Sequence, residues 1–161
     1  HTIVFLSGVL PGKSLKEYSM DDINKVFSIN IIGQTFLLKK LNLLMATNSC
    51  ILMMSSISAQ RGSFDPIYAS SKAAILGLVK SMISHLPKKS RINAIAPGLI
   101  EKSKMFDDMN QKRQNFHKEK IHSGKLLSSS DLANIIFDLC QDHWSHLNGA
   151  CIDLNGGQNV R

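Results

Sequence analysis

Residues 51–56, Ile51-Leu52-Met53-Met54-Ser55-Ser56, end a dozen residues before Tyr68–Lys72, the stretch around which the rest of the chain is organised. Four apolar residues followed by two serines predict a buried parallel strand that delivers hydroxyl groups from its carboxyl end. A helix over residues 68–86 is expected next. Residues 91–96 then predict a second strand, which runs into the turn Pro97-Gly98.

The predicted helix begins with Tyr68-Ala69-Ser70-Ser71-Lys72. A tyrosine and a lysine four residues apart lie on one face of a helix, one turn from each other. A free phenol has a pKa of about 10. A nearby ammonium stabilises the phenolate, so Tyr68 would exchange a proton with a substrate at neutral pH, with the Ser56 hydroxyl holding the substrate oxygen. The same spacing also arises by chance in many helices, so the pair alone does not establish catalysis.

Four motifs occur in one order along nearly the whole chain. They are M-S-S-x-S-A-x-R-G at 54–62, Y-A-S-S-K-A-A at 68–74, R-I-N-A-I-A-P-G at 91–98 and I-D-L-N-G-G at 152–157. This order resembles the short-chain dehydrogenase/reductases, especially their 3-oxoacyl-[acyl-carrier-protein]-reductase-like branch. The resemblance implies the α/β class: a single partial Rossmann-fold domain over 1–161, with strands four to seven of a seven-stranded, doubly wound parallel sheet.

The resemblance also implies an oxidoreductase that moves a hydride between NAD or NADP and a small carbonyl or alcohol substrate. Tyr68 would be the general acid in reduction, Lys72 would lower its pKa and bind the nicotinamide ribose, and Ser56 would hold the carbonyl oxygen. Asn30, in the family's N-x-x-G segment, would hold a water that relays protons to the lysine; the alternative is a bond from its amide to the backbone. The residues expected to bind the cofactor are Gly8, Tyr68, Lys72, Pro97, Gly98 and Ile100.

The chain departs from the family pattern in three places. Residues 5–8 read Phe-Leu-Ser-Gly where the family usually has Asn-Asn-Ala-Gly, and Lys102 stands where a threonine often contacts the cofactor, with Ser103 beside it. No Gly-rich phosphate-binding turn is found, and the first strand, whose edge would be exposed, matches the family's fourth. We therefore expect the catalytic portion of a longer protein, without the residue that separates NAD from NADP.

Two other functions stay open from the sequence. A catalytically idle member of the family, used as a binding or assembly module, is favoured by the departures over 5–8 and by the missing cofactor half. The presence of Asn30, Ser56, Tyr68 and Lys72 together counts against it. A serine hydrolase is a weaker option, because Ser56 lies in no G-x-S-x-G motif.

The helix expected over residues 20–44 carries two apolar stripes, with Ser19 as its N-cap. The stripe assigned to the sheet contains Ile23, Val26, Phe27, Ile31, Leu37, Leu38 and Leu41, and the second contains Ile29, Ile32 and Phe36. A helix that is apolar on two sides is covered on two sides. We expect a homo-oligomer, a dimer or tetramer, through helices 20–44 and 68–86; coverage by a loop of the same chain is the alternative.

Composition and residue spacing argue against several classes of binding partner. The formal charge is +7, but the basic residues are scattered and no nucleic-acid motif accompanies them, so we expect no nucleic acid. No apolar run reaches about 18 residues, so no membrane span is expected. The histidine pairs 117/122 and 143/146 lack further ligands at suitable spacing and predict no metal site. The three cysteines, Cys50, Cys140 and Cys151, are expected to be reduced thiols of a cytoplasmic protein.

Residues 101–125 are polar and basic, with isolated large apolar residues. We interpret them as a mobile helical lid over the substrate. A solvated surface helix is the alternative. Residues 128–131, Ser-Ser-Ser-Asp, predict the start of a last helix that reaches Cys140.

Overall fold

Four parallel strands form one sheet in the order β1-β2-β3-β4. The structure is a computed structural model, and it describes residues 1–160. The strands are β1 (Thr2–Phe5), β2 (Cys50–Met54), β3 (Arg91–Pro97) and β4 (Cys151–Leu154). Every residue of β3 is buried, whereas β1 lies at one edge of the sheet, as expected. The predicted parallel α/β class is confirmed.

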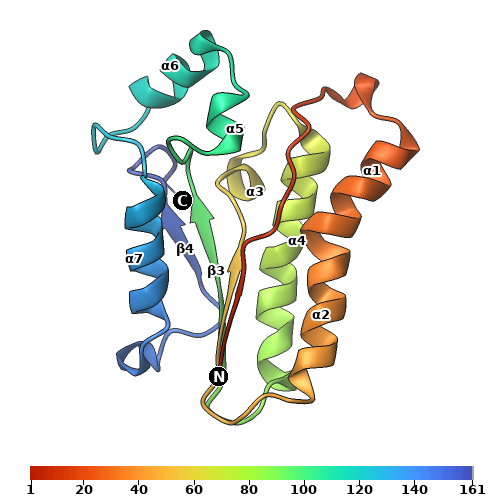
Figure 1. The fold of residues 1–161 in the computed structure, drawn as a ribbon, viewed down its shortest axis with the longest axis vertical. Coiled ribbons are helices and arrows are strands. Elements are labelled where there is room, and N and C mark those ends of the chain that lie inside the picture. The colour runs from red at the N-terminus through yellow and green to blue at the C-terminus, as the bar shows by residue number, and fades with distance from the viewer. Residues whose placement is uncertain (161) are drawn as a thin grey trace.

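Helices cover both faces of the sheet (Figure 1). On one face lie α1 (Met20–Phe27), α2 (Gly33–Asn42) and α4 (Pro66–Met82), and on the other lies α7 (Ser129–Leu139). Shorter helices are α3 (Ser58–Arg61), α5 (Lys104–Asp107) and α6 (Gln111–Glu119), with 3₁₀ turns at Leu15–Glu17, Ile83–His85 and Asp142–Trp144. Helices on both faces make the sheet doubly wound, as predicted.

The alternation of side chains along β2 builds a core on each face of the sheet. Ile51 and Met53 pack with Ile75 of α4, while Leu52 packs with Leu132 of α7. A fully buried parallel strand is apolar on both sides, and this is why residues 51–54 read as a continuous apolar run. Between β1 and α7 a cavity of about 780 Å³ remains, lined by residues that include Val4, Leu6 and Phe137.

A π-helical turn interrupts the helix predicted over residues 20–44. The Ser19 hydroxyl accepts from the Asp22 N–H (3.1 Å), so the predicted cap is confirmed. The π turn spans Ser28–Ile32, and the N–H of Gly33 donates to the Ser28 carbonyl five residues earlier. The single helix that we expected is therefore α1, a π turn and α2 in succession.

The π turn also changes which side chains face the sheet. Val26, Asn30, Gln34 and Leu38 are the buried residues along this helix, at intervals of four. Our assignment of Leu37 to the sheet-facing stripe was wrong, since it is 48% exposed. The extra residue in the turn rotates everything after it, a shift that a regular 3.6-residue period does not anticipate. The second stripe is off the sheet, as predicted, with Ile32 and Phe36 exposed.

The helix predicted over 68–86 has different ends in the structure. It begins at Pro66, with Asp65 as its N-cap, and its α-helical part ends at Met82, followed by a 3₁₀ turn. Asp at the N-cap and Pro at the first helical position are a strong start signal, so the helix begins two residues earlier than predicted. The last helix agrees with the prediction: the Ser128 hydroxyl accepts from the Asp131 N–H (3.0 Å), and α7 ends at Leu139 with Cys140 as its C-cap.

Within residues 1–160 no helix is both long and apolar enough to span a bilayer. No disulfide joins the three cysteines of this part of the chain. Residues 101–125 contain α5 and α6, which confirms their helical character; whether they move as a lid stays a prediction.

Candidate active site

Most of the predicted site residues line one cavity of about 420 Å³ at the carboxyl ends of β2 and β3. In parallel α/β sheets this edge is where ligands bind. The lining residues among those predicted are Gly8, Ser56, Tyr68, Lys72, Pro97, Gly98 and Ile100. They come from segments up to 92 residues apart in the sequence, since Gly8 and Ile100 both line it.

The two adjacent serines after β2 have different partners. The Ser55 hydroxyl donates to the Lys72 carbonyl (2.9 Å), which fixes the end of β2 against α4. Ser56 lines the cavity together with Tyr68, and its hydroxyl accepts from the Ser58 N–H (3.1 Å). Of the two hydroxyls, Ser56 is therefore the one placed to contact a ligand together with Tyr68.

Tyr68 is only 6% exposed, and burial is the main reason that its pKa is raised above the ordinary value of a phenol. The hydrogen bond with Ser56 acts in the opposite direction, and the charge of Asp65 raises the pKa further. We had expected Lys72 to lower this pKa; in the structure the net direction is upward. A phenol with a raised pKa carries its proton at neutral pH, the form that a general acid needs.

Lys72 is 2% exposed, and burial lowers its pKa to about 8. Its ammonium donates to the Met54 carbonyl at the end of β2 (2.8 Å). A β-carbon built on Gly8 would come within 3.0 Å of this ammonium nitrogen. The backbone at Gly8 therefore passes directly over Lys72, and a side chain at this position would fill the space beside it.

Asn30 is completely buried in the π turn and makes three hydrogen bonds. Its Oδ1 accepts from the Val9 N–H (2.8 Å), and its Nδ2 donates to the Val9 carbonyl (3.0 Å) and to the Ser71 hydroxyl (2.9 Å). The alternative of bonding to the backbone is thus observed. The amide ties the segment after β1 to α4 and does not line the cavity. Its role as holder of a relay water stays a prediction.

Several lining residues were missed from the sequence. Leu6, Val9 and Leu10 come from the segment after β1, and Lys104 and Asp108 come from α5 and its C-terminal end. No motif marks them, because they enter the site through the path of two irregular segments. At the position of the family threonine, Lys102 is exposed with a φ of 55°, whereas its neighbour Ser103 lines the cavity.

The parallel sheet and the helices on its two faces form a Rossmann-like fold, with the Ser56, Tyr68 and Lys72 side chains at one strand edge as its candidate site. A family profile described as enoyl-(acyl carrier protein) reductase matches residues 1–159. The chain belongs to the short-chain dehydrogenase/reductase family.

Curated relatives agree with this membership. An uncharacterised short-chain type dehydrogenase/reductase of Sinorhizobium fredii is 33% identical, covering 93% of this chain and 61% of the relative. The 3-oxoacyl-[acyl-carrier-protein] reductase of Aquifex aeolicus is 30% identical (94% and 62%), as is meso-2,3-butanediol dehydrogenase of Serratia marcescens (94% and 61%). The chain thus spans about three fifths of the length of these relatives.

A solved structure supports the same fold. The short-chain dehydrogenase/reductase from Brucella melitensis described as a glucose/ribitol dehydrogenase superposes with a TM-score of 0.88 at 26% identity. The match covers 99% of this chain and 64% of that structure.

Proposed function

We propose that the protein containing this chain is a nicotinamide-dependent oxidoreductase that interconverts a carbonyl and an alcohol. The observation that carries the proposal is the convergence of Ser56, Tyr68 and Lys72 on one cavity at the carboxyl edge of the sheet. The names of the Aquifex and Serratia relatives, a 3-oxoacyl reductase and a butanediol dehydrogenase, point to the same type of chemistry.

The roles follow from the positions of the three side chains. The Ser56 hydroxyl holds the substrate oxygen beside the phenol of Tyr68, which donates its proton to that oxygen during reduction and takes it back during oxidation. The Lys72 ammonium lies beside the path of Gly8 and supplies positive charge on the cavity wall. Correct placement of the reacting groups and proton transfer each lower the barrier.

The residues that line the cavity fit the nicotinamide end of NAD or NADP. At Gly8 the backbone comes close to Lys72, and at Gly98 an added β-carbon would lie 3.3 Å from the backbone of Asn155. Gly8 thus leaves space beside Lys72, Gly98 lets β3 pack closely on the segment after β4, and Pro97 and Ile100 line the cavity with them. When bound, the cofactor supplies or accepts the hydride. Lys72 would hold its ribose hydroxyls.

We also propose that the protein is a cytoplasmic homo-oligomer. The stripe predicted to face a partner contains Ile29, Ile32 and Phe36, of which Ile32 and Phe36 are 59% and 60% exposed. Leu37, which we had assigned to the sheet, is exposed as well. Large apolar side chains gathered on one helix face are typical of an interface. The absence of disulfides among the cysteines of residues 1–160 fits a reducing compartment.

The test is Tyr68→Phe in the intact protein, which removes one hydroxyl and keeps the ring. Turnover of carbonyl substrates with NADH or NADPH should fall at least about 100-fold, with cofactor binding largely kept. Ser70→Ala on the exposed side of the same helix is the matched control and should leave turnover unchanged. Unchanged turnover in Tyr68→Phe contradicts the proposal. A wild-type protein that binds a partner but turns over no carbonyl would favour the idle binding module.

A further inference from the structure

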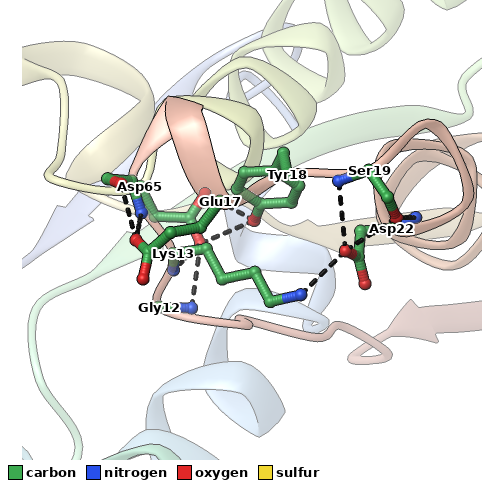
Figure 2. Close-up of polar contacts among 8 residues, drawn as sticks. Gly12, Lys13, Glu17, Tyr18, Ser19, Asp22 and Asp65 are labelled. Atoms are coloured by element: carbon green, nitrogen blue, oxygen red, sulfur yellow. Dashed lines mark hydrogen bonds and ion pairs between the residues drawn. The ribbon is translucent and has the colours of Figure 1, made fainter.

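Asp65, the N-cap of α4, accepts hydrogen bonds from a segment about 50 residues earlier in the chain (Figure 2). Its Oδ2 accepts from the backbone N–H of Gly12 (2.9 Å) and of Lys13 (3.3 Å). The Tyr18 hydroxyl lies 2.8 Å from Oδ1 and 2.7 Å from Oδ2. Oδ1 also accepts from the Tyr68 N–H (2.8 Å). One carboxylate therefore joins this early segment to the first turn of the helix that carries Tyr68.

This carboxylate is buried, with Asp65 only 1% exposed. A buried carboxylate is costly unless donors satisfy it, and here four donors surround its two oxygens. Burial, together with the hydrogen bond and charge of Asp65, raises the pKa of Tyr18, so its phenol keeps its proton and remains a donor at neutral pH. Loss of any one donor leaves the buried charge partly unsatisfied.

A second contact fastens the other end of the same segment. The Asn30 side-chain amide accepts from the Val9 N–H and donates to the Val9 carbonyl, and it also donates to the Ser71 hydroxyl of α4. The segment from Val9 to Tyr18 is thus held at two points to the layer of α4. Val9, at the first of these points, and Leu10, next to it, line the candidate cavity.

We propose that Asp65 and Tyr18 are positioning residues: they strap segment 9–18 to the N-terminus of α4 and so fix the cavity wall against the Tyr68 phenol. The kinetic part rests on the proposed function, whereas the strap is a property of this chain alone. Tyr68 lies in the first turn of α4, so fraying of that turn would displace its phenol. A displacement of about 1 Å can reduce a rate by roughly 100-fold.

Two variants of the intact protein separate the strap from the helix cap. Tyr18→Phe removes one donor and keeps the ring. Asp65→Asn keeps an oxygen for the Tyr68 N–H, and asparagine is a good N-cap. Its NH₂ group, however, would face the N–H groups of Gly12 and Lys13. Glu17→Gln is the control, because Glu17 is exposed in the same segment and bonds to Ser14.

The first readout is amide hydrogen exchange, which needs no activity. Exchange over residues 9–18 should become about tenfold faster in Tyr18→Phe and faster still in Asp65→Asn, since a hydrogen bond to a charged group contributes about 1.5–3 kcal/mol. Exchange over β3 should be unchanged, which shows that the variants are folded. Glu17→Gln should match the wild type in residues 9–13.

The second readout is the split between kcat and KM. Tyr18→Phe should raise the substrate KM about tenfold with a smaller change in kcat. The substitution loosens the cavity wall formed by segment 9–18 but keeps the hydrogen bond by which Asp65 caps α4. Asp65→Asn should lower kcat as well. Unchanged exchange over 9–18 in both variants overturns the strap, and faster exchange with unchanged kcat/KM overturns the positioning role. If the wild-type protein turns over no carbonyl, the proposed function is wrong. The exchange rates then still show whether Asp65 and Tyr18 hold segment 9–18 to α4.

Discussion

The candidate cavity has two walls, and the chain holds them to very different degrees. On one wall Tyr68 and Lys72 are 6% and 2% exposed, and both belong to a helix packed against the sheet. On the other wall Lys104 and Asp108 pair with each other (3.0 Å) while their side chains are 87% and 63% exposed. Packing in the core therefore holds Tyr68 and Lys72 in place, whereas Lys104 and Asp108 are held by an exposed ion pair.

This difference suggests a division of labour. Proton transfer needs fixed distances, which a buried helix supplies. Selection among substrates tolerates a wall that changes, and such walls are commonly built from loops and short helices. The following variants test the comparison between the two walls, starting with the largest expected effect.

Two lysines line the same cavity and offer a matched pair. Lys72→Met in the intact protein should reduce turnover at least about 100-fold, because it removes a buried charge beside Tyr68. Lys104→Met should change turnover less than about threefold, since its ammonium is solvated. Steady-state kinetics with both cofactors measure the two effects. Equal losses in the two variants would show that the walls do not differ as argued.

The contribution of side-chain packing to stability should also be larger on the buried wall than on the exposed one. Ile75 is a completely buried residue of α4, so Ile75→Ala should lower the free energy of unfolding by about 2–5 kcal/mol. Phe106 is half-buried against the small cluster of Leu99, Ile121 and Leu126, so Phe106→Ala should cost less, about 1–2 kcal/mol. Urea unfolding gives both values. A larger loss at Phe106 would place that wall in the core.

The burial of Lys72 should also make stability depend on pH. The folded protein releases this proton at a pKa of about 8, whereas an unfolded lysine keeps it to about pH 10. Between these values the unfolded state binds more protons, so the free energy of unfolding rises with pH, by at most about 3 kcal/mol.

Urea unfolding of the wild type and of Lys72→Met at pH 7.5, 9 and 10 measures this rise. The raised pKa of Tyr68 acts in the opposite direction above about pH 10, and it is present in both proteins. The difference between the two proteins therefore isolates the lysine. A wild-type curve parallel to that of the variant would argue against a buried ammonium.

The smallest effect is expected at the exposed ion pair. Asp108→Asn removes the partner of Lys104, and such pairs four residues apart on a helix contribute about 0.3–0.5 kcal/mol. The thermal midpoint in low and in 0.5 M salt should differ little between variant and wild type. A loss above about 1 kcal/mol would mean that this wall is held more firmly than its exposure indicates.

Much of the buried wall could be predicted from the sequence. Ser56, Tyr68 and Lys72 stand in local motifs, and the strand that precedes them is apolar on both faces, so their position at a sheet edge follows from short-range patterns. The start of α4 is also encoded locally, by Asp65 and Pro66, although we had placed it at residue 68. Fold and motifs were accessible because neighbouring residues encode them.

The remaining features depend on contacts distant in the sequence. The bond between Tyr18 and Asp65 spans 47 residues and has no motif. The partners of Asn30 are Val9 and Ser71, 21 and 41 residues away. Leu37 was wrongly assigned to the sheet-facing stripe because the π turn adds one residue and so breaks the 3.6-residue period on which the assignment depended. These features depend on how helices and loops distant in the sequence pack together, so they cannot be predicted from the residue pattern within one helix or strand.

The π turn at Ser28–Ile32 has a consequence for insertions and deletions. The turn holds one residue more than an α-helical turn does, so deleting one residue here would restore α-helical spacing and leave Leu38 on the side that faces the sheet. A one-residue deletion within α2, between Gly33 and Leu38, would instead turn the residues after it by about 100°, and Leu38 would leave the sheet. Single-residue deletions should therefore be tolerated better in the π turn than in α2, and the exposed stretch 46–48 just beyond the helix can absorb them too.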